Sequence, residues 1–579
     1  MLLTTSEMAS IFHRSRTLTV NILFIMPLNE PFEVIVNADL SPELNKLNTQ
    51  TRIKKVDCVY PTGLLSIASY LKKHLSEASI SIVDCNVEIN KMAELKGGHG
   101  FTREEYFEHC LNAAEKKCPA PDLIGLSLLF CSNFADLEPF AASVKKRWPE
   151  SFMIAGGHLP SAIYQRIFRD GSALDAICFG EGEIPVLDLC YAMQQGKKAQ
   201  YLSEDTCWIT PEKLNRIPDF KPEAKLLEDL DEIPPFDFNM LHAPEAYKVS
   251  SRYFFVIEST EDLPEMLIFS TRGCPYHCVF CASQNVHGHK VRRYSTERIK
   301  SDILYYNRNF GIKRFVFYDD HFLSSKKRAI EILEFVGSLN LRAEIPTPAF
   351  FAIDDEVAAA MKKAGINEVN ITIESGNADT LKNIINKPGN LEHAKRAVDE
   401  LHKVGITAIS NILIGLPGET KEAIEESIRY LASTDVNWFQ CFVTAPLPGS
   451  RMWDICEKNG YFTELDPYRM DFKKCVVRTP DFDPEYIEHK VYQMNLYLNF
   501  VNNYDMRSGN YAEALKLFER ILNTVIGTHA FAMYFAAKCC EKLGLHERYQ
   551  HHKTNYYKML EKYPFWKKWR DEFALEELA

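Results

Sequence analysis

The sequence predicts an α/β protein with three parts: a doubly wound amino-terminal domain, a parallel barrel and an α-helical carboxyl-terminal region. Short apolar runs alternate with segments of helical periodicity through most of the 579 residues, a pattern typical of parallel sheets covered by helices. Beyond about residue 475 only the helical periodicity continues. The expected parts are a domain over residues 1–197, a linker over 198–260, the barrel over 261–475 and the helical region over 476–579.

The amino-terminal domain is predicted to contain strands over residues 20–26, 80–83, 123–130, 152–155 and 176–179, with helices between them. Doubly wound sheets bind ligands at the carboxyl ends of their strands. The small and polar residues at those ends are Ser127, Gly156, Gly157, His158, Gly180, Glu181 and Gly182. Glycines there allow the backbone to approach a large ligand closely. No Gly-x-Gly-x-x-Gly follows the first strand, which disfavours a dinucleotide.

Residues 198–260 lose clear periodicity and gather prolines, which indicates an extended connector. Strands are expected again at 267–270, 313–319, 367–374, 406–413 and 438–444. Their carboxyl ends carry polar clusters that include Glu374, Ser375, Gly415 and Glu419. Because parallel barrels place their chemistry at this end of the strands, the clusters predict a single active mouth.

Cys274, Cys278 and Cys281 form a Cys-x3-Cys-x2-Cys motif on the loop that leaves the first of these strands. Thiolates are soft ligands that suit iron–sulfur clusters. A cubane held by three cysteines keeps one iron open for a substrate or cofactor. Structural zinc sites are normally closed by four ligands, and His277 is a candidate fourth ligand for such a site. The spacing favours the open cluster over zinc.

With this motif at a strand end, the chain resembles the radical S-adenosylmethionine (SAM) superfamily. The resemblance implies a partial (β/α)6 barrel and a [4Fe-4S] cluster whose open iron chelates SAM for reductive cleavage to a deoxyadenosyl radical. Phe280 matches a position near the adenine, Glu374 and Ser375 match contacts to the ribose and amino acid portion, and Gly415 and Glu419 match a motif beside the adenine. The alternative for Glu374 is a surface carboxylate that caps the following helix.

The amino-terminal element order, with Pro61-Thr-Gly63 and Gly180–Glu183, resembles the flavodoxin-like cobalamin-binding domain fused ahead of many radical SAM enzymes. The resemblance implies corrin contacts at the seven strand-end residues named above. The Asp-x-His-x-x-Gly motif is absent, so base-off cobalamin without a histidine ligand is expected, with His158 at the corrin edge or in solvent. The alternative is a doubly wound module that binds nothing, or a different nucleotide.

Composition and charge bear on the partners and the cellular compartment of the protein. A net charge of −11 and a pI near 5.9 give no reason to expect nucleic acid binding. Sixteen scattered cysteines favour a reducing cytoplasm over a secreted disulfide framework. No apolar stretch reaches the ~18 residues expected of a membrane span. Residues 509–522 and 530–543 resemble one tetratricopeptide repeat, and we expect this lone unit to pack on the barrel.

The resemblance implies a class B radical SAM methyltransferase that methylates an unactivated carbon of a small molecule, with electrons from a donor such as flavodoxin or ferredoxin. The alternative is a radical cyclase or rearrangement enzyme acting on a tetrapyrrole or isoprenoid-like substrate. A different class is a non-catalytic sensor of cobalamin or SAM. The sequence does not identify the substrate, a catalytic side chain or the oligomeric state.

Overall fold

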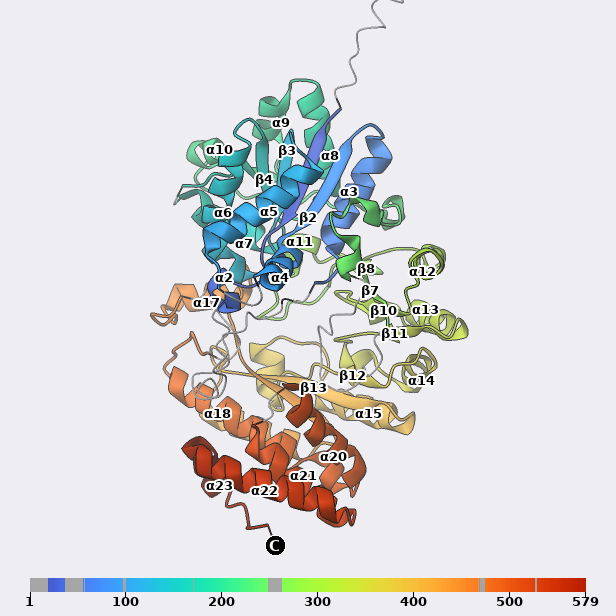
Figure 1. The fold of residues 1–579 in the computed structure, drawn as a ribbon, viewed down its shortest axis with the longest axis vertical. Coiled ribbons are helices and arrows are strands. Elements are labelled where there is room, and N and C mark those ends of the chain that lie inside the picture. The colour runs from blue at the N-terminus through green and yellow to red at the C-terminus, as the bar shows by residue number, and fades with distance from the viewer. Residues whose placement is uncertain are drawn as a thin grey trace, which may run out of the picture. The chain divides into compact units, whose positions relative to one another are not determined.

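The computed structural model describes residues 19–36, 56, 58–96, 100–169, 171–247, 263–466, 468, 474–525 and 528–578 (Figure 1). Its contacts divide the chain into two compact units. Among the described residues, the first unit takes in everything up to residue 247 together with the segment Ser283–Ser295. The second takes in residues 263–282 and everything from Thr296 onward. The peptide bond between Ala282 and Ser283 therefore joins the two units.

The first unit is built on a six-stranded sheet with the order β2-β1-β3-β4-β5-β6. The strands are β1 (Asn21–Met26), β2 (Ser79–Asp84), β3 (Leu123–Ser127), β4 (Phe152–Gly156), β5 (Ala176–Cys178) and β6 (Trp208–Ile209). The first five are parallel, and β6 pairs with β5 in the antiparallel sense. The five predicted strands are thus confirmed, while β6 and the short helices α9 (Lys198–Glu204) and α10 (Pro211–Arg216) lie in the range expected to be a connector.

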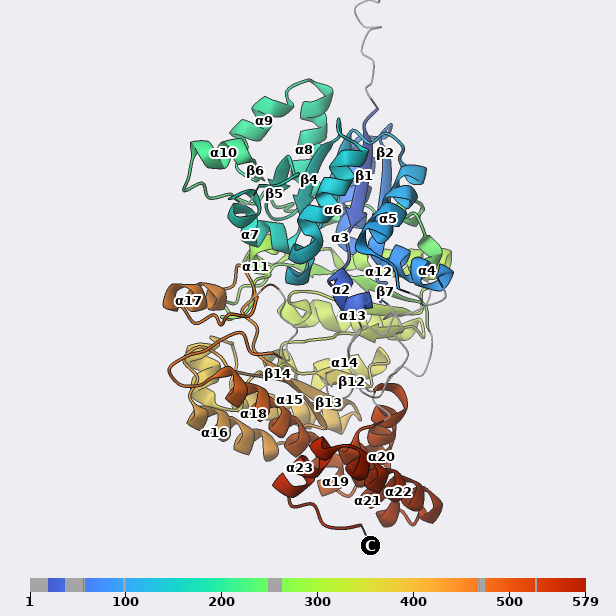
Figure 2. The ribbon, with the colours of Figure 1, turned by 60° about the vertical axis from the view of Figure 1, so that its left-hand side comes forward.

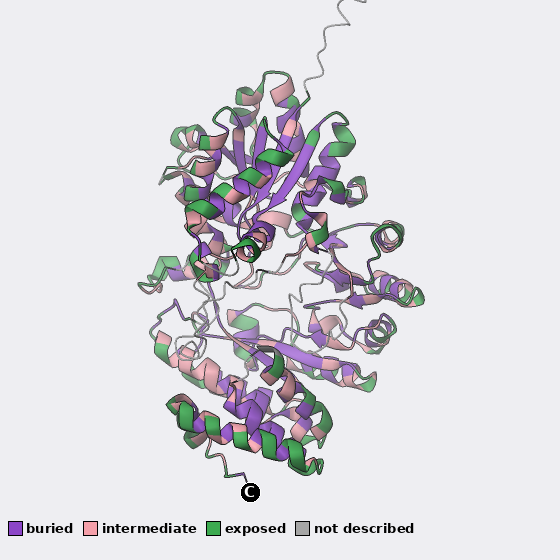
Figure 3. Cartoon of the chain, viewed as in Figure 1, coloured by how far each residue is buried: buried purple, intermediate pink, exposed green. Residues whose placement is uncertain are grey.

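Helices cover both faces of this sheet, as the doubly wound prediction requires (Figure 2). They are α3 (Thr62–His74), α4 (Cys85–Leu95), α5 (Arg103–Lys117), α6 (Phe134–Arg147), α7 (His158–Arg169) and α8 (Glu183–Gln194), with the short α2 (Phe32–Val36) after β1. Helix α3 packs on α8, while α5 packs on α4 and α6. Because β1 is covered on both faces, its residues from Ile22 to Met26 are all buried (Figure 3). Burial on both faces explains why the sequence of β1 from Ile22 to Met26 is a continuous apolar run.

The second unit contains the six strands of the predicted (β/α)6 arrangement as two three-stranded parallel sheets, β11-β10-β7 and β12-β13-β14. The strands are β7 (Glu265–Ile268), β10 (Arg314–Phe317), β11 (Arg342–Glu344), β12 (Glu368–Asn370), β13 (Thr407–Ile414) and β14 (Trp438–Val443). Helices α12 (Thr296–Phe310), α13 (Lys326–Ser338), α14 (Asp355–Lys363), α15 (Leu391–Lys403) and α16 (Lys421–Ala432) alternate with them. The short β8 (Thr271–Arg272) follows β7.

The carboxyl-terminal part is helical, as expected. It comprises α17 (Arg451–Asn459), α18 (Pro484–Leu496), α19 (Tyr504–Arg507), α20 (Tyr511–Arg520), α21 (Ala530–Lys542), α22 (His546–Lys562) and α23 (Pro564–Glu572), with π-helical turns at Tyr497–Val501 and Ile521–Val525. Its buried side chains from Leu496 onward form one core with Ile409 of β13 and Trp438 of β14. The expectation that this region packs on the barrel is confirmed. No helix among the described residues is both long and apolar enough to cross a membrane.

Asn499 extends the edge of the second sheet. Its Oδ1 accepts from the backbone N–H of Phe439 at 2.7 Å, and its Nδ2 donates to the carbonyl of the same residue at 2.8 Å. Asn499 is fully buried. We expect Asn499→Leu to cost about 2–4 kcal/mol, because two buried backbone groups lose their partners. Urea unfolding measures this, with Asn459→Ala as the control, since the amide of Asn459 is exposed and bonds only within its own helix. Equal stabilities of the two variants would contradict the prediction.

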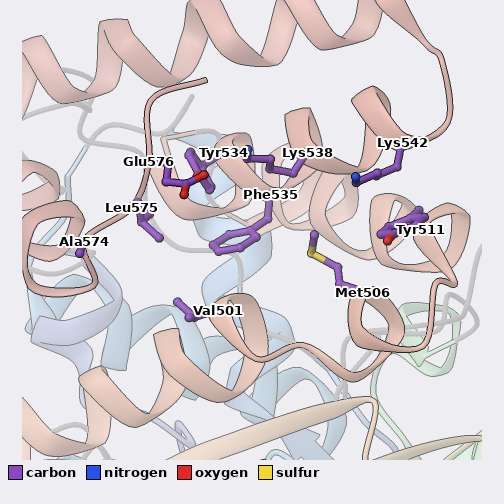
Figure 4. Close-up of a pocket in the computed structure, with 10 residues that line it drawn as sticks. All are labelled: Val501, Met506, Tyr511, Tyr534, Phe535, Lys538, Lys542, Ala574, Leu575 and Glu576. Atoms are coloured by element: carbon purple, nitrogen blue, oxygen red, sulfur yellow. The ribbon is translucent and has the colours of Figure 1, made fainter. Parts of the chain in front are cut away.

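A cavity of about 430 Å³ lies among the carboxyl-terminal helices (Figure 4). Val501, Met506 and Phe535 form apolar parts of its wall, while Lys538 and Lys542 add positive charge. None of its lining residues is among those predicted to hold a cofactor. The cavity is therefore a feature of the helical region itself.

Candidate active site

The start of the cysteine loop is held by the two carboxylates that follow β10. Asp320 accepts a hydrogen bond from the backbone N–H of Gly273 at 2.8 Å, and Asp319 accepts from the hydroxyl of Ser270 at 2.9 Å. Arg328 of α13 donates to the hydroxyl and the carbonyl of Ser270 at 3.1 and 3.0 Å. Burial raises the pKa of Asp319 to about 7. These carboxylates therefore fix the backbone directly before the first cysteine.

The rest of the loop is held by backbone contacts from later parts of the unit. The N–H of Val279 donates to the carbonyl of Ile385 at 2.8 Å, and the carbonyl of Val279 accepts from Met452 at 2.8 Å. The side-chain amide of Asn386 donates to the carbonyl of His277 at 3.2 Å. Two later segments, at Ile385–Asn386 and at Met452, thus determine the shape of a loop that has no regular secondary structure.

Cys274, Cys278 and Cys281 are half-buried, form no disulfide bonds and interact electrostatically with one another. Burial raises the pKa of Cys278 to about 11, and the negative charges of Cys281 and Cys274 act in the same direction. The positive charge of Lys387 opposes this rise at both Cys278 and Cys274. The three thiols therefore lie within electrostatic reach of one another, and Lys387 is the cation that favours the thiolate form of Cys278 and Cys274.

Among the described residues, no group of three or more His, Cys, Asp or Glu side chains has the spacing for a single metal ion. The structure thus gives no support for a closed zinc site completed by His277. A cubane spreads its thiolate ligands over several irons, so its ligands lie further apart than those of one ion. A set of three half-buried, mutually interacting thiols fits a cubane better than it fits zinc.

Glu374 is buried and ion-paired beside this loop. Its Oε1 lies 2.8 Å from Nζ of Lys387, and the two side chains are 7% and 10% exposed. Lys387 also donates to the hydroxyl of Thr372 at 3.0 Å. The backbone of Glu374 has a φ of 73°, which residues other than glycine rarely adopt. This burial excludes the alternative of a surface carboxylate, and the unusual backbone marks a constrained site.

Ser375 is fully buried next to Glu374, and its hydroxyl accepts from the N–H of Asn377 at 3.2 Å. Phe280 is half-buried on the cysteine loop. A small cavity of about 150 Å³ is lined by Val279 of that loop together with Pro417. The cysteine loop and the Gly415–Glu419 loop are therefore neighbours.

Glu419 closes the Gly415–Glu419 loop on itself. Its Oε2 accepts from the backbone N–H groups of Gly415 and Leu416 at 2.9 and 3.3 Å, while its Oε1 is buried with no protein hydrogen bond. Gly415 has a φ of 88°, and an added β-carbon would lie 3.0 Å from Ile487. The chain thus presents a buried carboxylate oxygen with spare capacity to accept a hydrogen bond.

Burial raises the pKa of Glu419 from 4.5 to about 7. The folded state therefore holds this proton more tightly than the unfolded chain, so its contribution to stability is full below pH 4.5 and is lost as the pH rises toward 7. We expect Glu419→Gln not to show this loss. As the pH rises from 4.5 to 8, the free energy of unfolding of the variant should increase relative to that of the wild type by on the order of 3 kcal/mol. Urea unfolding without ligands at several pH values checks this, and parallel curves for the two proteins would contradict it.

At the carboxyl edge of the first unit's sheet, the predicted cobalamin residues lie together. Ser127 pairs with Gly156 in the β3–β4 register. A β-carbon added to Gly157, whose φ is 108°, would lie 2.5 Å from the carbonyl oxygen of Leu128. The hydroxyl of Ser161 donates to the carbonyl of Gly157 at 2.8 Å and accepts from the N–H of Gly180 at 3.2 Å. The turns after β3, β4 and β5 thus form one continuous surface.

The two carboxylates of the Gly180–Glu183 motif are engaged within the protein. Glu181 is buried and lies within 2.8 Å of Arg292. Glu183 accepts from the hydroxyl of Ser66 on α3 at 2.5 Å. His158 begins α7, directly after Gly157. Contacts of these residues with a corrin remain a prediction.

Sequence reasoning missed several residues at both sites. Lys387 lies in a loop and not at a strand end, and Ser161 lies inside a helix, so no strand-end pattern marks them. Leu129 and Phe130 follow β3 and are 46% and 41% exposed. Their position at the carboxyl edge could have been read from the sequence, since the predicted strand runs through both. Exposure of two adjacent apolar side chains at a ligand edge suggests a large apolar ligand.

Comparison with known proteins agrees with this division of the chain. Residues 268–431 match the family model of the radical SAM superfamily, and residues 52–189 match that of the B12 binding domain. The chain is 27% identical over 361 residues to an uncharacterized methyltransferase of Pyrococcus horikoshii, which covers 60% of this chain and 73% of the relative. It is 25% identical over 472 residues to the cytidylyl-2-hydroxyethylphosphonate methyltransferase of Streptomyces wedmorensis, with 76% and 85% covered.

A further relative is the anaerobic magnesium-protoporphyrin IX monomethyl ester cyclase of Rubrivivax gelatinosus, 24% identical, with 63% of this chain and 62% of the relative covered. Two solved structures share the fold. The cobalamin-dependent radical enzyme OxsB aligns with a TM-score of 0.58 at 14% identity over 97% of this chain and 82% of its own. The methyltransferase TsrM from Kitasatospora setae aligns with a TM-score of 0.55 at 14% identity over 93% and 99%.

Proposed function

We propose that this chain, which belongs to the radical SAM superfamily and carries a B12-binding domain, methylates an unactivated carbon of a small molecule. The proposal has two halves, one for each cofactor-binding region. The barrel half binds a [4Fe-4S] cluster and SAM, and the doubly wound half binds cobalamin. The relatives from Pyrococcus horikoshii and Streptomyces wedmorensis, of which 73% and 85% are covered, are methyltransferases by name, which supports methyl transfer.

The observation that carries the proposal is that three cysteines outside any disulfide lie beside the buried Glu374–Lys387 pair. Cys274, Cys278 and Cys281 are the ligands of the cluster in this proposal. A three-thiolate cluster supplies the electron for SAM cleavage and cobalamin carries the methyl group, so the hard chemistry belongs to the cofactors. The protein's own residues bind, orient and exclude water.

At the proposed SAM site, the chain has buried side chains of both charges. Glu374 presents a carboxylate held in place by Lys387, and Ser375 lies next to it. Glu419 presents a buried oxygen without a protein partner. In the proposal, Glu374 and Ser375 orient the ribose and amino acid portion of SAM, while Phe280, Gly415 and Glu419 border its adenine. Fixed groups of this kind position a ligand without reorganisation.

On the cobalamin side, the carboxyl edge of the sheet is open backbone with exposed apolar side chains. Gly156 and Gly157 place no side chain at this edge, and Leu129 and Phe130 present exposed apolar surface that a corrin would bury. Ser127, His158 and the Gly180–Gly182 turn complete this edge. We assign His158 to the corrin edge and not to cobalt, since it begins a helix directly after a turn.

The partners in the proposal are a small-molecule substrate and a reducing protein such as flavodoxin or ferredoxin, with no nucleic acid. The setting is the cytoplasm. None of the sixteen cysteines, all of which the structure describes, forms a disulfide bond, which fits a reducing compartment.

Anaerobic purification followed by iron, sulfide and cobalt counts and an absorption spectrum tests the cofactors. We expect four irons and four sulfides per chain and a corrin spectrum after loading with hydroxocobalamin. Reduction with SAM should release deoxyadenosine and S-adenosylhomocysteine. A protein without a cluster, or one that retains no cobalamin, would contradict the proposal.

The cyclase relative makes a radical cyclisation or rearrangement the second candidate. Methyl-labelled SAM separates the two, because only methyl transfer places the label in a product. Deoxyadenosine release would exclude the sensor class, since a sensor does not cleave SAM.

A further inference from the structure

The segment that directly follows the cysteine loop belongs to the first unit. Cys281 lies in the second unit, and the chain enters the first unit at Ser283 and leaves it after Ser295. Within this segment, helix α11 (Gln284–His287) packs on α7, and β9 (Arg292–Arg293) follows it. The cluster loop is therefore connected at its carboxyl-terminal side to a short piece of chain with a different packing environment.

A buried ion network holds this segment to the turn after β5. The guanidinium of Arg292 donates to both oxygens of Glu181, from Nη1 to Oε2 at 2.8 Å and from Nη2 to Oε1 at 2.6 Å. The two side chains are 2% and 3% exposed. His287 places its Nδ1 2.8 Å from the same Oε1. Arg292 also donates to the carbonyls of Leu227 and His287 at 2.7 and 3.1 Å. Such a two-pronged pair fixes both position and angle.

The glycines around Glu181 allow the close approach that this network needs. Gly180 has a φ of 82°, and an added β-carbon would lie 2.6 Å from the β-carbon of Ala224 and 3.5 Å from the carbonyl oxygen of Val286. A β-carbon on Gly182 would lie 2.6 Å from Ile67. At these two positions the motif is therefore packed against the linker, the segment after the cysteines and helix α3, with no space for a side chain.

The energetics separate this network from ordinary surface pairs. Removing one partner of a buried pair leaves an uncompensated charge, which strongly destabilises its surroundings. The same segment carries a natural control, since Lys290 pairs with Glu228 at 2.5 Å but the two side chains are 72% and 67% exposed. Exposed pairs of this kind contribute little. The segment therefore carries two ion pairs: the buried Arg292–Glu181 pair, which holds the chain, and the exposed Lys290–Glu228 pair, which contributes little.

We propose that residues 283–295 form a clasp in which Arg292 and His287 close on Glu181 and so fix the cluster loop at its carboxyl-terminal side. Glu181 is then a positioning residue that acts through the loop. The clasp acts on the cysteine loop through the chain itself, because the peptide bond after Ala282 joins the segment that holds Cys281 to the segment that holds Arg292. It rests on the proposed function only in that Cys281 is a cluster ligand.

Hydrogen–deuterium exchange on the full-length protein tests the clasp without any cofactor. In Arg292→Gln, we expect exchange of residues 283–293 to rise at least tenfold, with exchange of β1 and β3 unchanged. Lys290→Gln should behave as the wild type. Arg292→Lys keeps the charge without the planar fork, so its exchange should lie between the two. Unchanged exchange in Arg292→Gln, or equal effects of Arg292→Gln and Lys290→Gln, would overturn the clasp. Should Arg292→Gln not fold, Arg292→Lys against Lys290→Gln decides the question alone.

Iron release to a chelator from the reconstituted, cobalamin-free protein tests the link to the cluster. We expect the release rate to rise at least tenfold in Arg292→Gln and in Glu181→Gln, with Lys290→Gln unchanged. Faster exchange with unchanged iron release would show a local structural role and overturn the positioning role. A wild type that assembles no cluster would refute the proposed function, while the exchange comparison would still decide whether the clasp exists.

Discussion

Anaerobically prepared Cys278→Ala protein is expected to hold no [4Fe-4S] cluster and to release no deoxyadenosine from SAM above the background of the uncatalysed reaction. The thiols of Cys274 and Cys281 would remain, and two ligands do not hold a cubane whose fourth iron is already open. The fold should survive, because the loop is anchored through the backbone of its neighbour Val279. Iron and sulfide counts, and deoxyadenosine measured after reduction, check this.

Cys441→Ala is the matched control. Cys441 also lies in the second unit, on β14, but burial alone raises the pKa of its thiol strongly and no neighbouring thiol contributes. We expect this variant to keep a full cluster and to cleave SAM at the rate of the wild type. Loss of iron in both variants would indicate general instability, and iron retained in Cys278→Ala would show that Cys278 is not a ligand.

Much of the fold could be predicted because its central strands are buried on both faces. The predicted strand over 20–26 became β1, which is a continuous apolar run from Ile22 to Met26, and that over 406–413 became β13 (Thr407–Ile414), which ends in the apolar residues Ile412–Ile414. Strand β6 could not be predicted in the same way. It is a two-residue antiparallel edge strand inside a proline-rich range, and it forms only because β5 offers it a partner.

The strand-end rule predicted one mouth because carboxyl ends of parallel strands meet at one edge, and Glu374 does lie within electrostatic reach of Cys278, while Pro417 of the Gly415–Glu419 loop lines a cavity with Val279. The partners of these residues could not be predicted. Lys387 reaches Glu374 from a loop, and Arg292 reaches Glu181 across 111 residues of sequence. A short motif reports which chemical groups are present, but the charge opposite a buried carboxylate depends on how distant segments pack.

Lys387→Met is expected to destabilise the second unit by about 3–5 kcal/mol, the range for breaking a buried ion pair. The change leaves Glu374 buried with a negative charge and without its cation, on a backbone already held at a φ of 73°. It also removes the positive charge that favours the thiolate of Cys278. We therefore expect weaker iron retention as well as lower stability. Urea unfolding of the cluster-free protein measures the first effect, and iron counts after reconstitution measure the second.

The double variant Lys387→Met/Glu374→Gln separates two causes: the unpaired charge left on Glu374 and the loss of the cation beside the thiols. It removes the unpaired charge, so most of the lost stability should return, whereas iron retention should stay low because the cation beside the thiols is still missing. Lys395→Met controls for loss of a lysine, since Lys395 pairs with Asp399 on an exposed face of α15, and its stability should equal that of the wild type within error. Full recovery of iron in the double variant would show that Lys387 acts on the cluster only through Glu374. Stability unchanged in the single variant would mean that the two side chains are not paired in solution.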